Sequence, residues 1–131
     1  MKNELQKLLD RSRFLRPYAF RVLAVKNGSC TIELPHRPAL ERPGGIVNGP
    51  ALMAAADCAM WLAIKAKLGV EQDALTSEMN TAFLAPARAE AVRCTATILK
   101  LGKRRVYGVA ECRGKSGKLV SHHTLTYARP A

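Results

Sequence analysis

The sequence predicts a single α+β domain, in which one long apolar helix lies among antiparallel strands. The length of 131 residues suits one domain, and no repeat, linker or low-complexity stretch divides it. Residues 49–68 have the length of a helix and are almost entirely apolar, whereas an ordinary surface helix is apolar on one side only. The remaining segments are short runs that alternate like strands and are separated by turn residues.

The N-terminal part of the chain is expected to form a helix and a hairpin. Residues 2–15 place their leucines near one face of an amphipathic helix, which Pro17 should stop. The β-rich runs 20–25 and 29–34 flank Asn27-Gly28, a strong hairpin signal.

A Pro- and Gly-rich loop over 35–45 follows, and the helix over 49–68 should then end at Gly69 as a C-cap. Four further strands are predicted, and with the first two they should form an antiparallel sheet wrapped around the central helix: residues 75–84, 91–100, 105–113 and 119–127.

Composition narrows the class of protein. Hydrophobic residues make up 48% and charged residues 24%, as in ordinary soluble proteins. The longest apolar stretch, 51–64, is too short to span a bilayer, and no signal peptide is recognisable. The four cysteines lack metal-site spacing and are interpreted as reduced, mostly buried thiols of a cytoplasmic protein.

The net charge of +11 is the unusual bulk property. It indicates an anionic partner, which could be nucleic acid, an anionic membrane or a phosphate-bearing small molecule. Specific nucleic-acid binding is disfavoured because the basic residues are scattered and no aromatic-rich strand offers a surface for stacking bases. No membrane partner is expected.

Asp57 is the only ionisable residue within the apolar stretch 51–64. A carboxylate in such a setting is costly unless it is paired or hydrogen-bonded, and active sites use such perturbed acids. Two interpretations remain open, namely a catalytic acid and a structural hydrogen-bond partner of a residue such as Thr76.

The segment 43–50 precedes the helix and contains three glycines, which permit close approach to a ligand. Free N–H groups at the start of a helix can bind an oxyanion. Pro50 suits the first helical turn. The alternative is a glycine-rich loop that is needed only for the turn.

Several of these segments together resemble the hotdog-fold thioesterases of the PaaI type. The family pattern of His-Gly-Gly followed by Leu-Ala-Asp aligns without a gap with Asn48-Gly49-Pro50 and Ala55-Ala56-Asp57. The strand 75–86, which ends in Phe-Leu-Ala-Pro, and the C-terminal segments beginning at Gly102 and Gly117 are also similar to the family. The resemblance covers roughly residues 15–128.

The resemblance implies a hotdog domain that forms a homodimer or homotetramer and cleaves acyl-CoA thioesters at the dimer interface. By position, Asp57 would be the base or nucleophile, the Gly49 N–H would polarise the carbonyl, and Thr76 of the partner subunit would position water. Asn48 and Arg42 occupy the positions of the family's loop His and polar loop residue, and are the expected substrate contacts there. Pro50 replaces the second glycine.

A basic cluster lies at the turn between the strands 91–100 and 105–113, and it consists of Lys100, Lys103, Arg104 and Arg105. It is either a solvated turn or a binding site for the phosphates of coenzyme A. His122 and His123 should point to opposite faces of a strand, so they are interpreted as surface or partly buried strand histidines and no metal site is expected.

The function expected from these residues is hydrolysis of an acyl-CoA or related thioester to a carboxylic acid and a free thiol. Asp57 would act as general base or attack directly. No cofactor is expected, because coenzyme A is part of the substrate. The alternative is a non-catalytic protein that binds acyl-CoA or an acyl carrier protein, and Asn48 and Pro50 are its main support.

Overall fold

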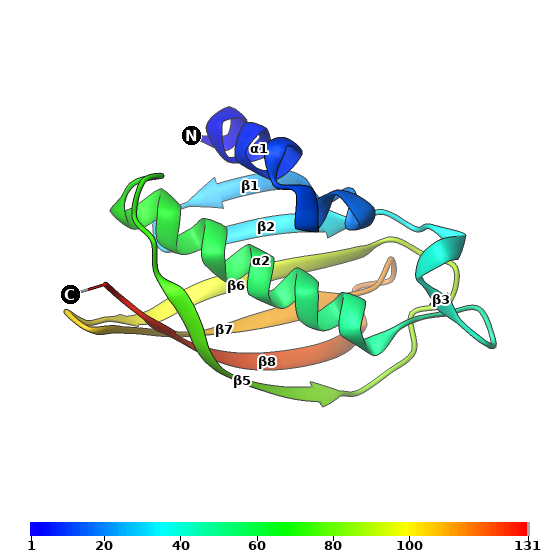
Figure 1. Cartoon of the computed structure of the whole chain (residues 1–131). Helices are drawn as coiled ribbons and strands as arrows, with labels where there is room; N and C mark the ends of the chain where they lie inside the picture. The colour runs from blue at the N-terminus through cyan, green and yellow to red at the C-terminus, as the bar shows by residue number, and fades with distance from the viewer. Residues whose placement is uncertain (131) are drawn as a thin grey trace.

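A computed structural model describes residues 1–130 of the chain (Figure 1). Its elements, in chain order, are α1 (Lys2–Arg11), the 3-10 helix η1 (Arg13–Tyr18), β1 (Arg21–Lys26), β2 (Ser29–Leu34), the 3-10 helix η2 (Pro38–Leu40), β3 (Glu41–Arg42), β4 (Ile46–Val47), α2 (Gly49–Leu68), β5 (Leu75–Phe83), β6 (Val92–Leu101), β7 (Arg105–Arg113) and β8 (Leu119–Ala128).

Six strands form one antiparallel sheet in the order β1-β2-β6-β7-β8-β5. The helix α2 crosses one face of this sheet, and α1 lies beside β1 at one edge (Figure 1). The predicted fold class, an α+β domain with a curved sheet around a long helix, is confirmed. β5 forms the opposite edge and pairs with β8 alone.

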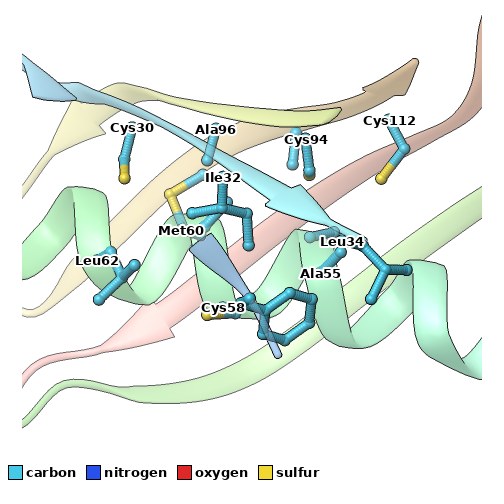
Figure 2. Packing of buried hydrophobic residues seen from close by; sticks show 14 of the residues in the cluster. Cys30, Ile32, Leu34, Ala55, Cys58, Met60, Leu62, Cys94, Ala96 and Cys112 are labelled. Atoms are coloured by element: carbon cyan, nitrogen blue, oxygen red, sulfur yellow. The ribbon is translucent and has the colours of Figure 1, made fainter. Parts of the chain in front are cut away.

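The helix α2 occupies the residues that the sequence predicts. The side chain of Asn48 caps its first turn by accepting a hydrogen bond from the Ala51 N–H at 2.8 Å. Gly69 ends it with a φ of 112°, which favours glycine. Small side chains such as Ala55 and Ala59 let the helix lie close to the sheet, and Figure 2 shows Met60 beside Ile32 and Ala96.

The core between α2 and the sheet is continuous and mainly aliphatic. All four cysteines are buried and free, as predicted. Among residues 1–130, no helix is long and apolar enough to cross a membrane.

Two local predictions differ from the structure. The N-terminal helix ends at Arg11 rather than at residue 15, because Ser12 leaves the helical region and its hydroxyl binds the Leu8 carbonyl at 2.7 Å. Pro17 therefore lies inside the separate helix η1. The loop over 35–45 also contains strand residues, since Glu41–Arg42 pairs with Ile46–Val47 in a short hairpin.

The helix α2 is less enclosed than its all-round apolar sequence predicts. Met53 is 37% exposed, and Asp57 and Trp61 are half-buried. The sheet packs against one side of the helix, and η1 and α2 both line a cavity. This leaves an open stripe, and Asp57 lies on it.

Candidate active site

Asp57 faces a cavity of about 490 Å³ that lies between α2, η1 and the start of β5. The cavity runs along the helix from Ala54 past Asp57 to Trp61. Leu75 and Thr76 at the start of β5 contribute to its wall. The site is therefore mainly apolar with a carboxylate on its wall, which is the usual composition of a small-molecule site.

Two hydroxyl groups hold one oxygen of the Asp57 carboxylate. The Thr76 hydroxyl donates to Oδ1 at 2.7 Å, and the Tyr127 hydroxyl donates to the same atom at 2.5 Å. The Tyr127 hydroxyl also lies 2.8 Å from the backbone oxygen of Asp57. These contacts fix the rotamer of the acid.

Thr76 reaches Asp57 within one chain, whereas the resemblance implied a threonine from the partner subunit that positions water. β5 and β8 pair so that Thr76 lies directly opposite Tyr127, and both side chains converge on the helix. In this structure Thr76 orients the carboxylate itself.

Tyr127 is a site residue that the sequence interpretation missed. It is 2% exposed, and burial together with the negative charge of Asp57 raises the pKa of its hydroxyl far above the ordinary value. It therefore stays protonated and remains a donor. Buried residues recur at every second position of β8, namely Ser121, His123 and Leu125, and Tyr127 is the next in this series. This alternation in the sequence could have indicated that Tyr127 faces the core.

The surroundings of Asp57 favour a chemical role over a purely structural one. The structural interpretation expected a hydrogen bond to Thr76, and that bond is present. However, Asp57 is only half-buried, it lines a cavity, and its Oδ2 atom accepts no hydrogen bond from residues 1–130. A structural acid would normally have both oxygens satisfied.

Lys65 shapes one end of the cavity. Its ammonium group is buried, donates to the carbonyls of Val70 and Gln72 at 2.7 and 2.5 Å, and lies 5.2 Å from the Trp61 ring centroid. These contacts hold the segment that leads to Asp73 and Ala74, which line the cavity beside Trp61.

Gly49 belongs to a second cavity of about 450 Å³ at the N-terminal end of α2. Arg42 is the only charged residue among its lining side chains, which otherwise include Leu52, Phe83 and Leu84. The Gly49 N–H is among the first N–H groups of the helix, which have no acceptor within it. This end can therefore bind a polarised oxygen.

Asn48 has a structural role here, although it was expected to contact substrate. Its side-chain oxygen caps α2, and its side-chain nitrogen donates to the Leu40 carbonyl at 2.6 Å. Both ends of the amide are thus engaged within the protein.

Asp57 and Gly49 cannot act on the same carbonyl within one chain. They are eight residues apart, and a rise of about 1.5 Å per residue separates them by about 12 Å along the axis of α2. The two cavities therefore lie at separate positions along α2.

The basic turn lies next to the Asp57 cavity. Arg105 pairs with Ala128, which pairs on its other side with Leu75 at the cavity wall. Two strand spacings of about 4.8 Å thus separate the turn from the cavity.

A shallow cavity at this turn is lined by Lys103, Arg104, Arg105 and the additional cation Arg129, whereas Lys100 lies outside it. Arg129 donates to the Gly102 carbonyl at 2.7 Å, which fixes the turn.

The histidines lie away from Asp57. His123 is fully buried, although a surface or partly buried position was expected, because it faces α2 and bonds the hydroxyls of Thr81 and Ser121 at 2.8 Å each. His122 faces the other way, as predicted. Within residues 1–130, no three His, Cys, Asp or Glu side chains are arranged to hold a metal ion.

Comparison with known proteins identifies the family. The family model of the thioesterase superfamily matches residues 44–121. A Thermoplasma acidophilum protein, named as an inferred esterase, is 30% identical over 95% of this chain and 93% of its own length. The chain belongs to the thioesterase superfamily.

Solved structures support the same fold. A conserved Pseudomonas aeruginosa protein shares 27% identity with a TM-score of 0.86, covering 91% of this chain and 94% of its own. An inferred thioesterase from Silicibacter sp. TM1040 shares 27% identity with a TM-score of 0.89. The match covers 99% of this chain and 92% of that protein. A Haemophilus influenzae thioesterase has a TM-score of 0.89 at 21% identity, and the match covers 98% of this chain and 89% of that protein. This likeness shows that the chain has the hotdog fold.

Proposed function

We propose that the protein hydrolyses acyl-CoA thioesters. Water adds its oxygen to the thioester carbonyl carbon, the C–S bond breaks, and the products are a carboxylic acid and the free thiol of coenzyme A. Membership of the thioesterase superfamily supports the hydrolysis of thioesters, and the acyl-CoA substrate is the proposal.

This function rests mainly on one observation: the two oxygens of the Asp57 carboxylate have different hydrogen-bond environments. Thr76 and Tyr127 hold Oδ1, while Oδ2 accepts no hydrogen bond from residues 1–130 and the acid lines a mainly apolar cavity. An oriented carboxylate with one free oxygen can take a proton from attacking water. It can also attack the carbonyl and form an anhydride that water then cleaves. Both routes use the same geometry.

The oxyanion site is proposed to come from a second copy of the chain. β5 is an edge strand with exposed or half-buried side chains along its whole length, and its outer backbone groups are available for pairing. A two-fold axis at Met79 would pair two β5 strands antiparallel, with Leu75 opposite the partner's Phe83.

That pairing would bring the Asp57 and Thr76 end of one chain to the Gly49 end of the other. Because Asp57 and Gly49 are too far apart within one protomer, a homodimer, alone or within a homotetramer, would complete the site. Arg42 would then lie at the oxyanion end of the substrate.

Coenzyme A is proposed to lay its phosphates on the basic turn. Lys103, Arg104, Arg105 and Arg129 make no ion pair with any carboxylate of residues 1–130, so their charges are available. Their place two strands from the cavity fits a substrate that reaches from the phosphates to Asp57. The cytoplasmic localisation and the lack of a cofactor stay predictions.

The test is a thiol-release assay over aromatic, short and long acyl-CoA thioesters with wild type and Asp57→Asn. The variant keeps the shape and the Oδ1 acceptor, so folding and CoA binding should persist while turnover falls about 10²-fold or more. Asp73→Asn is the matched control, because Asp73 lines the same cavity without contacting Thr76 or Tyr127. Equal turnover in all three proteins would refute the assignment. Tight acyl-CoA binding without hydrolysis by wild type would favour the non-catalytic binder.

A further inference from the structure

Two of the buried cysteines lie directly opposite each other on neighbouring strands. Cys94 on β6 pairs with Cys112 on β7, and both side chains are fully buried in the core between the sheet and α2. Figure 2 shows both on the face of the sheet that α2 covers. The other two differ, because Cys30 lies opposite apolar residues on both neighbouring strands and Cys58 lies on α2. Cys94 and Cys112 therefore form a neighbouring pair of thiols.

The register of β6 brings this pair to the spacing of a disulfide. The Ile98 N–H donates to the carbonyl of Gly28, just before β2, at 2.8 Å. Backbone groups of a strand point to alternate sides, so Cys94, four residues earlier, also bonds towards β2 and forms a non-hydrogen-bonded pair with Cys112. The Cα atoms of such a pair lie about 4.5 Å apart, within the range of about 4.4–6.8 Å that a disulfide bridges. The two sulfur atoms can therefore be joined without a change of strand register.

Polar neighbours activate the Cys112 thiol. Nε2 of His123 lies 3.8 Å from its sulfur, and the hydroxyls of Ser121 and Thr81 hold the imidazole ring at 2.8 Å each. Hydrogen bonds, of which that from Cys94 is the strongest, outweigh burial and lower the pKa of the Cys112 thiol. The same contact and burial raise the pKa of the Cys94 thiol. Cys112 thus has the thiolate character of a nucleophile, and Cys94 keeps its proton beside it.

An oxidant must reach this buried pair through a part of the fold that opens. The pairing of β7 with β8 shifts register between Cys112 and Arg113, and the turn that joins the two strands follows at once. Local opening costs less at such a place than in the centre of a sheet. The cavity at the Gly49 end of α2 is also near, because Leu52 lines it and the Leu52 carbonyl oxygen lies 3.8 Å from Cys112 Sγ. These routes suit a small oxidant such as hydrogen peroxide.

We propose that Cys94 and Cys112 form a reversible disulfide that lowers the turnover of the site in response to oxidant. The Cys112 thiolate attacks one oxygen of hydrogen peroxide, the O–O bond breaks, and the hydroxide that leaves takes a proton from solvent. The Cys94 sulfur then attacks the sulfenic acid on Cys112, the S–O bond breaks, and water leaves with the Cys94 proton. Two electrons pass from the two thiols to one peroxide, which becomes two molecules of water.

The disulfide would alter the oxyanion end of α2. It draws the Cys112 sulfur towards Cys94 and away from the carbonyl of Leu52, a residue that lines the cavity there. It also removes the sulfur from His123, and His123 is bonded to Thr81 on the edge strand β5. The change thus reaches both the helix end and the strand that are proposed to complete the site. This regulation rests on the proposed thioesterase function, whereas the disulfide itself does not.

The chemical test maps the thiols of the protein after treatment with hydrogen peroxide. Wild type has four free thiols and should lose two, with a Cys94–Cys112 link inside one chain by mass spectrometry and full recovery in dithiothreitol. Cys94→Ala and Cys112→Ala should each form no disulfide. Cys30→Ala is the matched control, because it removes an equally buried thiol from the same core, and it should still lose two thiols. No link, or a link between other cysteines or between two chains, would overturn the inference.

The functional test measures hydrolysis of an acyl-CoA thioester after the peroxide has been removed by gel filtration. In wild type and Cys30→Ala, turnover should fall about 10-fold or more, because small displacements in an active site have effects of this size, and it should return on reduction. Cys94→Ala should show no loss that reduction reverses. A disulfide that leaves turnover unchanged would overturn the regulation. If untreated wild type hydrolyses no thioester, the proposed function fails, and the thiol map alone decides whether the pair forms.

Discussion

At the scale of single residues, the candidate site depends on how one carboxylate is held. Thr76 comes from β5 and Tyr127 from β8, and both donate to Oδ1 of Asp57 on α2. Three elements thus fix one rotamer, and Oδ2 is left for chemistry. Such orientation by neighbouring groups is what makes a general base effective.

Tyr127→Phe tests this orientation. The fold should persist with a loss of about 1 kcal/mol in the free energy of unfolding, the ordinary contribution of a hydrogen bond. Turnover should fall, but less than in Asp57→Asn, because the carboxylate remains and Thr76 still holds it. Thermal denaturation and the thiol-release assay measure the two effects. Turnover equal to wild type would show that Tyr127 has no part in positioning the acid.

The raised pKa of Tyr127 determines the pH range over which its hydrogen bond to Asp57 persists. A free tyrosine loses its proton near pH 10, but burial and the Asp57 charge favour the neutral form. The hydrogen bond to Asp57 should therefore survive through the usual tyrosine range.

At the scale of elements, the position of α2 depends on close packing against β6 and β7. Gly108 on β7 lies where a methyl group would collide with the Thr97 backbone oxygen and the Met60 side chain. Glycine here lets Met60 seat the helix against the sheet. This contact helps to set the distance between α2 and the sheet, and therefore the position of Asp57.

Gly108→Ala should destabilise the fold by about 1–3 kcal/mol, the typical cost of overpacking, because the Thr97 carbonyl belongs to a strand and cannot move freely. Gly114→Ala is the matched comparison and should cost less, since the added methyl group meets mainly the ends of the Glu90 and Lys118 side chains. Denaturant unfolding of both variants gives the comparison. Equal stability of Gly108→Ala and wild type would contradict the packing argument.

The cations of the turn between β6 and β7 are predicted to contribute to the binding of CoA thioesters. Lys103→Glu with Arg104→Glu should raise KM for CoA thioesters far more than it changes kcat, since the phosphates are remote from the reacting bond. The effect should weaken with salt. Lys100→Glu should have little effect, because Lys100 is exposed outside the cavity at this turn. Unchanged KM at low ionic strength would place the nucleotide elsewhere.

At the scale of the whole molecule, the two halves of the site lie at opposite ends of β5. The Asp57 cavity includes Leu75 and Thr76, and the Gly49 cavity includes Phe83. An antiparallel pair of β5 strands would join one half from each chain. Activity would then require association.

Phe83→Glu tests this association. Phe83 is 55% exposed and its ring lies against Gly49, so a charge there would be buried at the proposed interface. Sedimentation at micromolar concentration should show dimer or tetramer for wild type and a shift to monomer for the variant, with activity lost in parallel. Leu99→Glu, at a comparably exposed apolar residue on β6, should keep the dimer contact through β5. A monomeric and active wild type would exclude the shared site.

The sequence by itself determined most of the elements and the catalytic candidate. The helix 49–68, its end at Gly69 and the strands over the C-terminal half follow from local periodicity and turn residues, and the structure has them at nearly the same bounds. Asp57 was recognisable because a single charge in an apolar helix is costly wherever that helix packs. These properties are local, so they are visible along the chain.

Tertiary structure decided which distant residues meet Asp57. Tyr127 lies seventy residues away along the chain and reaches the acid only because α2 packs across β8. The side-chain period of a strand predicts the face on which Tyr127 lies, but not its partner strand. The open stripe on α2, the capping role of Asn48 and the inclusion of Arg129 in the basic turn likewise depend on how the elements pack, because burial and hydrogen-bond partners are set by contacts between segments that the sequence keeps far apart.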